Sequence, residues 1–277
     1  MFLVDCRMYT ERKSNTVRPK KSLGQHFLHD DNIAQRIVDA LLIDPASPLV
    51  LEIGPGMGVL TRLLIKRENI ELKVVEIDRD SVAYLKRNYS SLNGKIIEGD
   101  FLEIDISQIF QSMFSIIGNF PYNISSQIFF KILEVRDRVD QVVCMLQREV
   151  ADRIAAPPGS KTYGILSVLL QAYYDIEHLF KVMPGAFRPP PKVVSAVIRL
   201  RRNKRVKLEC NERLFTQVVK QAFNTRRKTL RNALKNLNLA AEIVALPLLD
   251  KRAEQLSVKD FEHLTLLIEK SRGTAGG

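Results

Sequence analysis

Short apolar runs alternate with segments of helical period over most of the chain before residue 204. The runs that have the length and composition of buried strands cover residues 49–53, 72–77, 95–99, 114–119 and 141–147. The spacing of apolar residues predicts helices at 30–42, from about 59, from about 80 and at about 126–133. This alternation is typical of a parallel sheet with helices on both faces.

Two later apolar segments, 179–183 and 195–200, flank a proline-rich turn and are expected to close the sheet as an antiparallel hairpin. After Asn203 only helical spacing continues, and Ser257 with Asp260 resembles a capping box that opens a last helix. We therefore predict an α/β fold with a Rossmann-like sheet and a small all-helical C-terminal domain. The expected division is a basic N-terminal arm at 1–21, a sheet domain at 22–203 and a helical domain at 204–277.

Composition excludes several classes of protein. No apolar run approaches the roughly 20 residues that span a bilayer, so we expect a soluble, cytoplasmic protein. Cys6, Cys144 and Cys210 lie too far apart for a disulfide framework or a zinc ribbon, which fits a reducing compartment. His26 and His29 have no carboxylate or thiol cluster beside them, so no metal site is expected.

Positive charge is concentrated in one stretch of the chain. The whole chain has 42 Lys and Arg against 31 acids, a net charge of +11. Residues 199–235 contain thirteen Lys and Arg against Glu209 and Glu212, so this window alone carries a net +11. A basic block of this kind indicates a polyanionic partner, and a solvated helix surface is the alternative.

A glycine-rich loop joins the first strand to its helix in VLEIGPGMGVLT, residues 50–61. Gly54, Gly56 and Gly58 allow a sharp turn and close approach of a ligand, although the spacing is neither that of dinucleotide folds nor that of the phosphate loop. Glu76 ends the second strand, 22 residues after Gly54. A carboxylate there can accept hydrogen bonds from both hydroxyls of a ribose.

The next strand is followed by Asp100 and Phe101, which can hold an adenine through a carboxylate and an apolar wall. Three successive strand ends thus present a glycine loop and two acids. Loop glycines and solvated acids explain each feature alone, but together they indicate a nucleoside cofactor lying across the sheet.

The fourth strand ends in Asn119-Phe120-Pro121-Tyr122. The exocyclic amine of adenine is a poor nucleophile, and two acceptors against its N–H bonds would make it more reactive. The Asn119 side-chain oxygen and the Phe120 carbonyl can be these acceptors, because a residue before proline is held extended. Tyr122 can stack on an extruded base. The alternative is an ordinary Asx-Pro turn with a core tyrosine.

These motifs together resemble S-adenosylmethionine-dependent adenine-N6 methyltransferases with a class I methyltransferase sheet. Further stretches, LGQHFLHD (23–30), FRPPPKVVSAV (187–197) and FNTRRKTLRNAL (223–234), are similar to the ribosomal RNA adenine dimethyltransferases, most closely the bacterial enzymes that act on small-subunit RNA. The resemblance covers roughly Lys20 to Ile268.

The resemblance implies S-adenosyl-L-methionine as the cofactor, with Gln25, His26 and Leu28 lining its methionine end. It also implies that Asn119 contacts the reactive end of the cofactor. It implies that Phe187 forms the second wall of a sandwich around the target adenine, opposite Tyr122. The implied product is N6,N6-dimethyladenine at two adjacent adenines in a hairpin loop of 16S-type RNA. The implied partner is a pre-ribosomal particle, and the enzyme is expected to be monomeric and to use no metal.

The chain departs from the family pattern at three positions. His26 stands where many relatives have Asn, and Phe120 where Leu or Pro is commoner. Val194 stands where the family has Asp, which leaves any role of that carboxylate without support.

Basic residues of the C-terminal part are expected to bind RNA phosphates without reading bases. The candidates are Arg226, Arg227, Lys228 and Arg231, of which some are expected to pair with acids of the fold instead. Three alternatives stay open: a large-subunit methyltransferase of the antibiotic-resistance type, a non-catalytic ribosome-assembly factor, and a DNA adenine methyltransferase.

Overall fold

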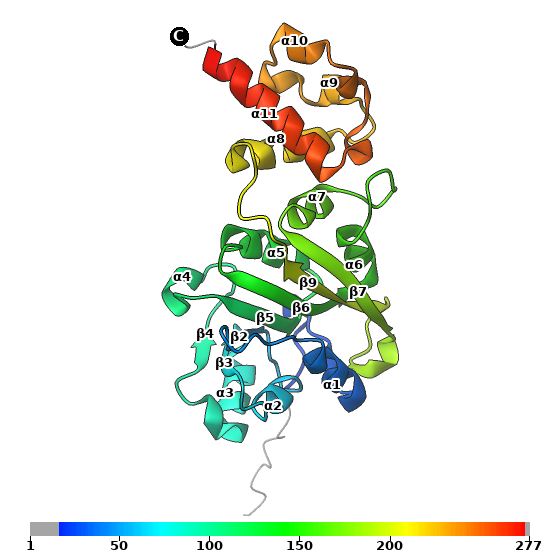
Figure 1. Ribbon diagram of the computed structural model, residues 1–277. Helices are drawn as coiled ribbons and strands as arrows, with labels where there is room; N and C mark the ends of the chain where they lie inside the picture. Colours follow the sequence, from blue (N-terminus) through cyan, green and yellow to red (C-terminus); the bar gives the residue numbers. More distant parts are fainter. Residues whose placement is uncertain (1–16, 275–277) are drawn as a thin grey trace, which may run out of the picture.

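The computed structural model describes residues 17–274, and its centre is a sheet of seven strands in the order β4-β3-β2-β5-β6-β9-β7 (Figure 1). The strands of this sheet are β2 (Leu49–Ile53), β3 (Glu71–Glu76), β4 (Ile96–Glu98), β5 (Phe114–Asn119), β6 (Val139–Gln147), β7 (Tyr174–Val182) and β9 (Ser195–Arg202). A second, two-stranded sheet pairs β1 (Phe27–Leu28) with β8 (Phe187–Arg188). The predicted Rossmann-like α/β fold is confirmed.

The pairing directions agree with the expected parallel sheet and its closing hairpin. Strands β2 to β6 pair in parallel, whereas β9 is antiparallel to both β6 and β7. The hairpin partner β9 is therefore inserted between β6 and β7, and β7 runs in the same direction as the first five strands of the sheet. All carboxyl ends of β2 to β5 consequently meet at one edge.

Each face of the sheet buries its own apolar cluster. In β6, Val142, Cys144 and Leu146 belong to one cluster, and Val143 and Met145 belong to the other. Successive side chains of a strand point to opposite faces, so an unbroken apolar run is what a strand covered on both sides requires. This explains why the length and composition of the apolar runs located these strands.

Helices cover both faces, and they begin where local capping allows. The helices before residue 204 are α1 (Asp31–Asp39), α2 (Thr61–Leu64), α3 (Arg79–Asn88), α4 (Ile106–Ile109), α5 (Ser125–Glu134), α6 (Arg148–Ile154) and α7 (Ile165–Gln171), with the 3₁₀ turns η1 (Lys21–Leu23), η2 (Ser90–Leu92) and η3 (Pro184–Ala186). The Asp30 carboxylate accepts a hydrogen bond from the Ile33 amide at 3.0 Å, an N-cap that starts α1 as predicted. The helix expected from about 59 is confirmed only as the four-residue α2.

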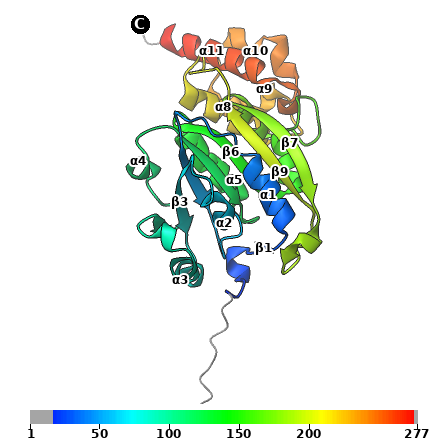
Figure 2. The same cartoon turned by 60° about the horizontal axis from the view of Figure 1, so that its bottom comes forward.

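Residues 204–274 form helices and contain no strand, apart from an isolated bridge between Thr229 and Arg252. This part contains α8 (Glu212–Asn224), α9 (Leu230–Ala233), α10 (Ala241–Val244) and α11 (Val258–Thr274), with the 3₁₀ turns η4 (Lys235–Leu237), η5 (Pro247–Asp250) and η6 (Ala253–Gln255). Ser257 and Asp260 form the predicted capping box, with amide-to-side-chain distances of 2.8 and 3.2 Å. Figures 1 and 2 both place these helices at one end of the molecule and α3 toward the other end, and in Figure 1 the helices lie beyond α7.

The boundary near residue 203 stays our proposal. It falls between the end of β9 at Arg202 and the start of α8 at Glu212. The apolar cluster is nevertheless continuous across it, because Phe215 and Phe261 share one buried core with Leu166 of α7. The two parts are therefore expected to unfold together.

The predicted basic arm lies mostly outside the described residues, which begin at Val17. Its last residues pack on the sheet domain: Val17 is 9% exposed, and Lys20 forms an ion pair with Asp80 at 2.7 Å. No helix within residues 17–274 is long and apolar enough to cross a membrane. The same residues contain no cluster of His, Cys, Asp and Glu that could hold a metal ion.

Candidate active site

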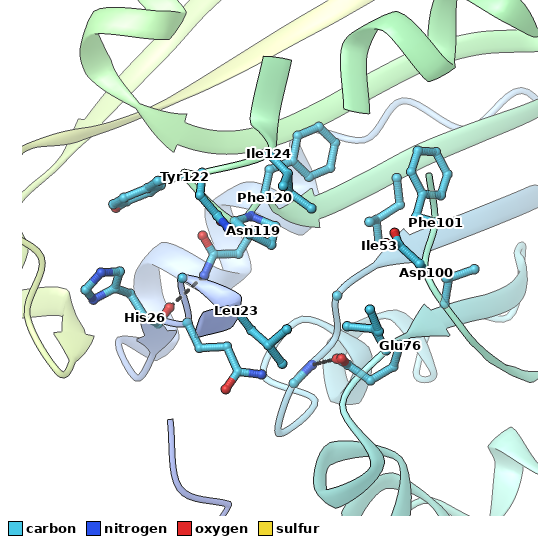
Figure 3. Close-up of a pocket in the computed structure, with 18 of the residues that line it drawn as sticks. Leu23, His26, Ile53, Glu76, Asp100, Phe101, Asn119, Phe120, Tyr122 and Ile124 are labelled. Carbon is cyan, nitrogen blue, oxygen red and sulfur yellow. Dashed lines mark hydrogen bonds between the residues drawn. The ribbon is translucent and has the colours of Figure 1, made fainter. Parts of the chain in front are cut away.

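The carboxyl ends of four neighbouring strands line one cavity of about 240 Å³, shown in Figure 3. Gly54 follows β2, Glu76 ends β3, Asp100 follows β4 and Asn119 ends β5. The predicted site residues that line it are Gln25, His26, Gly54, Gly56, Glu76, Asp100, Phe101, Asn119, Phe120, Pro121 and Tyr122. The structure therefore brings together residues that the sequence placed on separate strands.

The three glycines of the loop after β2 have left-handed backbones but different surroundings. Gly54 has a φ of 65° and no heavy atom within 4 Å of the position that a Cβ would occupy, so its open side faces the cavity. A Cβ at Gly56 would lie 2.8 Å from the Phe27 ring, and one at Gly58 would lie 2.6 Å from the Tyr89 ring. Gly58 does not line the cavity, and its absent side chain makes room for Tyr89 instead.

Glu76 is held in place by the backbone. Its Oε2 accepts a hydrogen bond from the Gly56 amide and its Oε1 accepts one from the Asp78 amide, both at 2.9 Å. Burial raises the pKa of Glu76, while these two amide donors act in the opposite direction. Each carboxylate oxygen keeps a second lone pair for a ligand. The two amides therefore fix the orientation of the side chain and leave it able to accept further hydrogen bonds.

The segment before β1 forms another wall of the cavity. Lys20 Nζ forms an ion pair with the buried Asp78, and Gln25 Nε2 donates to the same carboxylate at 3.3 Å. The Lys20 amide in turn donates to Gln25 Oε1 at 2.8 Å. Burial raises the pKa of Asp78, but the hydrogen bonds from Lys20, Gln25 and Ser81 outweigh this and lower it. A charged network therefore fastens this segment to the strand that carries Glu76.

Two predicted residues, Leu28 and Phe187, do not lie where the sequence placed them. Leu28 is 3% exposed and Phe187 is 1% exposed, and both pack in the core beneath α1. They face each other across the β1–β8 pair, so both side chains point to the same side of that ribbon. Phe27, one residue earlier, lines the cavity instead, and the expected aromatic wall opposite Tyr122 is not formed by Phe187.

The Asn119 amide is oriented by a single contact. Its Nδ2 donates to the His26 carbonyl at 2.9 Å, as the dashed line in Figure 3 shows. Within residues 17–274 neither Asn119 Oδ1 nor the Phe120 carbonyl accepts a hydrogen bond. The Phe120 amide donates to the Met145 carbonyl at 2.9 Å, and its ring is buried against Phe129. Both predicted acceptors are thus fixed in place with lone pairs remaining.

Tyr122 has a fixed ring and a buried hydroxyl. The hydroxyl is hydrogen-bonded to Ser195, and burial raises its pKa. The ring stacks with His26 at a centroid distance of 5.4 Å and an interplanar angle of 28°. His26 Nδ1 lies 2.8 Å from the Pro189 carbonyl, which requires a proton on Nδ1. The ring that stacks with Tyr122 in this structure is therefore that of His26 and not that of Phe187.

Sequence reasoning missed a buried acid beneath the site. Glu52 is 1% exposed, and its Oε2 accepts a hydrogen bond from the Thr61 hydroxyl at 2.7 Å. Burial raises the pKa of Glu52 to about 8. It lines a small cavity of about 30 Å³ behind the glycine loop, together with Gly54 and Asn119. The presence of an acid within the apolar run LVLEI could have indicated this buried carboxylate from the sequence.

The other missed lining residues include the apolar Leu23, Ile53, Val75, Ile77 and Ile124 and the polar Ser22 and Asn123. Val194 is half-buried, and its carbonyl accepts a hydrogen bond from the Arg148 amide at 3.0 Å. Nothing in the structure explains why Val replaces the family's Asp at this position.

The predicted RNA-binding residues lie in the helical part and divide into two groups. Arg226 pairs with Glu254 at 2.9 Å, and Arg231 pairs with Asp250 at 2.7 Å. Arg227 and Lys228 are exposed and form no ion pair with any described residue. This agrees with the expectation that some of these cations pair within the fold.

A protein-family model described as ribosomal RNA adenine dimethylase matches residues 16–270. A ribosomal RNA small subunit methyltransferase A from Cytophaga hutchinsonii is 56% identical over 252 residues, which cover 91% of this chain and 98% of that protein. The protein of the same name from Parabacteroides distasonis is 57% identical over 255 residues, with 92% and 95% covered.

Solved structures share the fold. A dimethyladenosine transferase from Plasmodium falciparum superposes with a TM-score of 0.74 at 25% identity, over 90% of this chain and 98% of that one. The 23S rRNA methyltransferase ErmE superposes with a TM-score of 0.63 at 24% identity, over 86% of this chain and 99% of that one. At that identity the second match supports the fold alone.

Proposed function

The chain belongs to the ribosomal RNA adenine dimethylase family, and from this premise we propose how its site performs the reaction of that family. The chain is an S-adenosylmethionine-dependent adenine-N6 methyltransferase that acts on ribosomal RNA. It converts two adjacent adenines in a loop of the small-subunit RNA to N6,N6-dimethyladenine.

The observation that carries the proposed mechanism is the orientation of Asn119. Its Nδ2 is engaged by the His26 carbonyl at 2.9 Å, which turns Oδ1 away from that contact. The Phe120 carbonyl is the next acceptor along the chain, and both belong to the cavity lining. Two acceptors held in this way suit an amine with two N–H bonds.

The residues of the cavity also fit the cofactor. Gly54 leaves open space, Glu76 offers a buried carboxylate with remaining lone pairs, and Phe101 with Ile53 offers an apolar wall. Glu76 would accept hydrogen bonds from the ribose hydroxyls, and Asp100 would bind the adenine. Gln25 and His26 would line the methionine end. Bound S-adenosylmethionine supplies an electrophilic methyl group on a sulfonium centre.

Residues of the chain orient the target adenine and activate its amine. Asn119 Oδ1 and the Phe120 carbonyl accept the N–H bonds of the target amine, which keeps the nitrogen lone pair available for attack. Tyr122 provides a ring face for the extruded adenine. Since the proton can leave to water after transfer, no general base is required. The second methylation requires the acceptors to tolerate a monomethylated amine.

The setting of the reaction and the contacts to RNA phosphates are also part of the proposal. We propose that the RNA is bound within a pre-ribosomal particle in the cytoplasm, by a monomer of this chain. Arg227 and Lys228 would bind phosphates of that RNA, since no described residue engages them. The site residues above are likewise assigned by this proposal.

The test is methyl transfer by the full chain to small subunits that lack dimethyladenine, compared with large subunits and with DNA. We expect label in small-subunit RNA only, and nuclease mapping should find N6,N6-dimethyladenine at two neighbouring positions. Label in large subunits or in DNA would favour one of the other methyltransferase classes. Binding to small subunits without any label would indicate a non-catalytic assembly factor.

A further inference from the structure

A second and larger cavity, of about 1010 Å³, adjoins the candidate active site. The two cavities share the wall residues Gly24, Gln25, His26, Phe27 and Tyr122. One side of the second cavity is the segment from Val17 to His29, and the other side is the proline-rich loop from Arg188 to Val193. We call it the flanking cavity.

The charge of the flanking cavity has one sign. Its lining contains Lys21, Arg188 and Lys192 together with two histidines, and no Asp or Glu among residues 17–274 belongs to it. All three cations are exposed, and none forms an ion pair or a side-chain hydrogen bond with a described residue. Their neighbour Lys20, by contrast, is bound by Asp78 and Asp80. Three unpaired cations around one cavity favour an anionic ligand.

The remaining lining is suited to a base rather than to a small ion. Phe27, Met57, Pro190 and Val193 give apolar surface, and Gln147 offers an amide that can donate and accept. Apolar surface inside a rim of cations is the combination that single-stranded nucleic acid requires, with bases on the former and phosphates on the latter.

The covalent continuity of the RNA strand also indicates a nucleotide as the ligand of the flanking cavity. An adenine that enters the site at Tyr122 remains attached to its neighbours through its ribose and phosphates. The main cavity is shared with the cofactor, so the attached chain has to leave it elsewhere. The flanking cavity opens from the same Tyr122 and His26 rings.

We propose that the flanking cavity holds the nucleotide next to the target adenine, with its phosphates bound by Arg188, Lys192 and Lys21. This inference rests on the proposed function and adds a subsite to it. The bound group is a nucleoside phosphate of the RNA strand itself. These cations act in substrate binding and not in the chemistry of transfer.

The experiment measures kcat/KM on undermethylated small subunits at several salt concentrations, for wild type and for the double variant Arg188→Gln, Lys192→Gln. Each lost contact to a single-stranded phosphate should reduce the slope of log(kcat/KM) against log[salt] by about 0.7. At ~0.1 M salt that corresponds to about a fivefold loss for one contact and about 25-fold for two. The loss should appear mainly in KM, and cofactor affinity should not change.

Two further variants separate charge from structure. Arg188→Lys keeps the charge and should recover most of the activity that Arg188→Gln loses. Lys66→Gln with Lys95→Gln removes two exposed cations that form no ion pair with a described residue and line neither cavity, and its salt slope should equal that of wild type.

A wild-type slope and wild-type kcat/KM in the Arg188, Lys192 double variant would overturn the flanking subsite while leaving the proposed function intact. An equal loss in the Lys66, Lys95 variant would also overturn it, because the effect would then be one of general charge. Absence of methyl transfer by wild type at every salt concentration would instead remove the proposed function, and the subsite with it.

Discussion

The sheet edge and the C-terminal helices both concentrate polar side chains, but internal contacts have opposite effects in the two regions. At the sheet edge, Glu76 and Asn119 each make contacts within the fold and keep an acceptor available toward the cavity. In the helices, Arg226 and Arg231 make contacts that occupy their charge, with Glu254 and Asp250. At the sheet edge, a hydrogen bond within the fold orients a side chain toward the cavity. In the helical part, an ion pair within the fold compensates the charge of an arginine.

Formal charge is therefore a poor measure of the charge that a partner can reach. Five of the thirteen cations in residues 199–235 pair with acids, and all five are arginines: Arg199, Arg202, Arg205, Arg226 and Arg231. None of the lysines in that window forms an ion pair with a described residue. Arginine's planar fork suits carboxylates of the fold. The lysines are left for solvent or a ligand, except Lys220, whose Nζ lies 5.0 Å from the centroid of the Phe130 ring.

The largest expected effect comes from removing the aimed acceptor at the sheet edge. Asn119→Ala deletes Oδ1, and loss of one such acceptor should lower turnover by about 1,000-fold. Cofactor affinity should stay within a few-fold of wild type, since Glu76 and the glycine loop are untouched. Single-turnover methyl transfer and calorimetric titration of the cofactor measure the two quantities.

The matched control is Asn88→Ala, which removes an exposed amide bonded only to the Tyr84 carbonyl of its own helix. Turnover of that variant should equal wild type. Undiminished turnover in Asn119→Ala would show that its amide is a structural turn residue.

The next effect concerns cofactor affinity. Glu76→Ala removes the carboxylate assigned to the ribose and leaves the Gly56 and Asp78 amides without their acceptor. The variant loses the two charge-assisted hydrogen bonds proposed between this carboxylate and the ribose hydroxyls, so affinity for the cofactor should fall by about 100-fold. Glu71→Ala, at the exposed start of the same strand, is the control. Equal affinities in the two variants would dismiss the ribose assignment.

A third effect depends on pH. The pKa of Glu52 is raised from 4.5 to about 8, so between these pH values the native state holds a proton that the unfolded state has lost. Wild-type stability therefore falls as pH rises through this window. Glu52→Gln has no such proton, and its free energy of unfolding relative to wild type should increase by about 2 kcal/mol from pH 5 to pH 7.

Urea unfolding at the two pH values measures this difference. Glu68→Gln makes the same change on an exposed side chain and serves as the control. A difference between wild type and Glu52→Gln that stays constant with pH would mean that Glu52 is ionised in the native protein.

Prediction from the sequence succeeded where a local pattern determines structure. The strands at 49–53 and 114–119 were predicted to the residue, because runs buried on both faces are mostly apolar. The convergence of Gly54, Glu76 and Asn119 followed from the direction of parallel strands, whose carboxyl ends share one edge.

It failed where a side chain's direction depends on a distant partner. The pairing of Leu28 with Phe187 joins residues far apart in the chain, and in a two-stranded ribbon a shift of one residue exchanges the two faces. No local pattern specifies that register, so Phe27 was overlooked in favour of Leu28. The same holds for Arg226, in the turn between α8 and α9, and for Arg231 of α9, whose acid partners lie 28 and 19 residues further along the chain.

The contrast within the helical part can be tested directly. Arg227→Ala with Lys228→Ala removes two cations that no described residue engages, so affinity for small subunits should fall by about 25-fold at ~0.1 M salt. Arg226→Ala with Arg231→Ala removes two paired cations, so it should weaken RNA binding less and lower stability instead. Equal losses of affinity in the two double variants would contradict the distinction between occupied and available charge.

The smallest expected effect lies where the two regions meet. The Tyr163 hydroxyl is buried without a hydrogen-bond partner among residues 17–274, and the centroid of its ring lies 6.2 Å from that of Phe223 in α8. Tyr163→Phe removes an unsatisfied polar atom and should leave stability equal or raise it by about 1 kcal/mol. Tyr174→Phe is the matched opposite, because that buried hydroxyl donates to the Val139 carbonyl at 3.3 Å and its loss should cost about 1 kcal/mol. Urea unfolding that finds both variants equally destabilised would show that Tyr163 has a partner in solution, and that the contact between sheet domain and helices is more polar than its packing indicates.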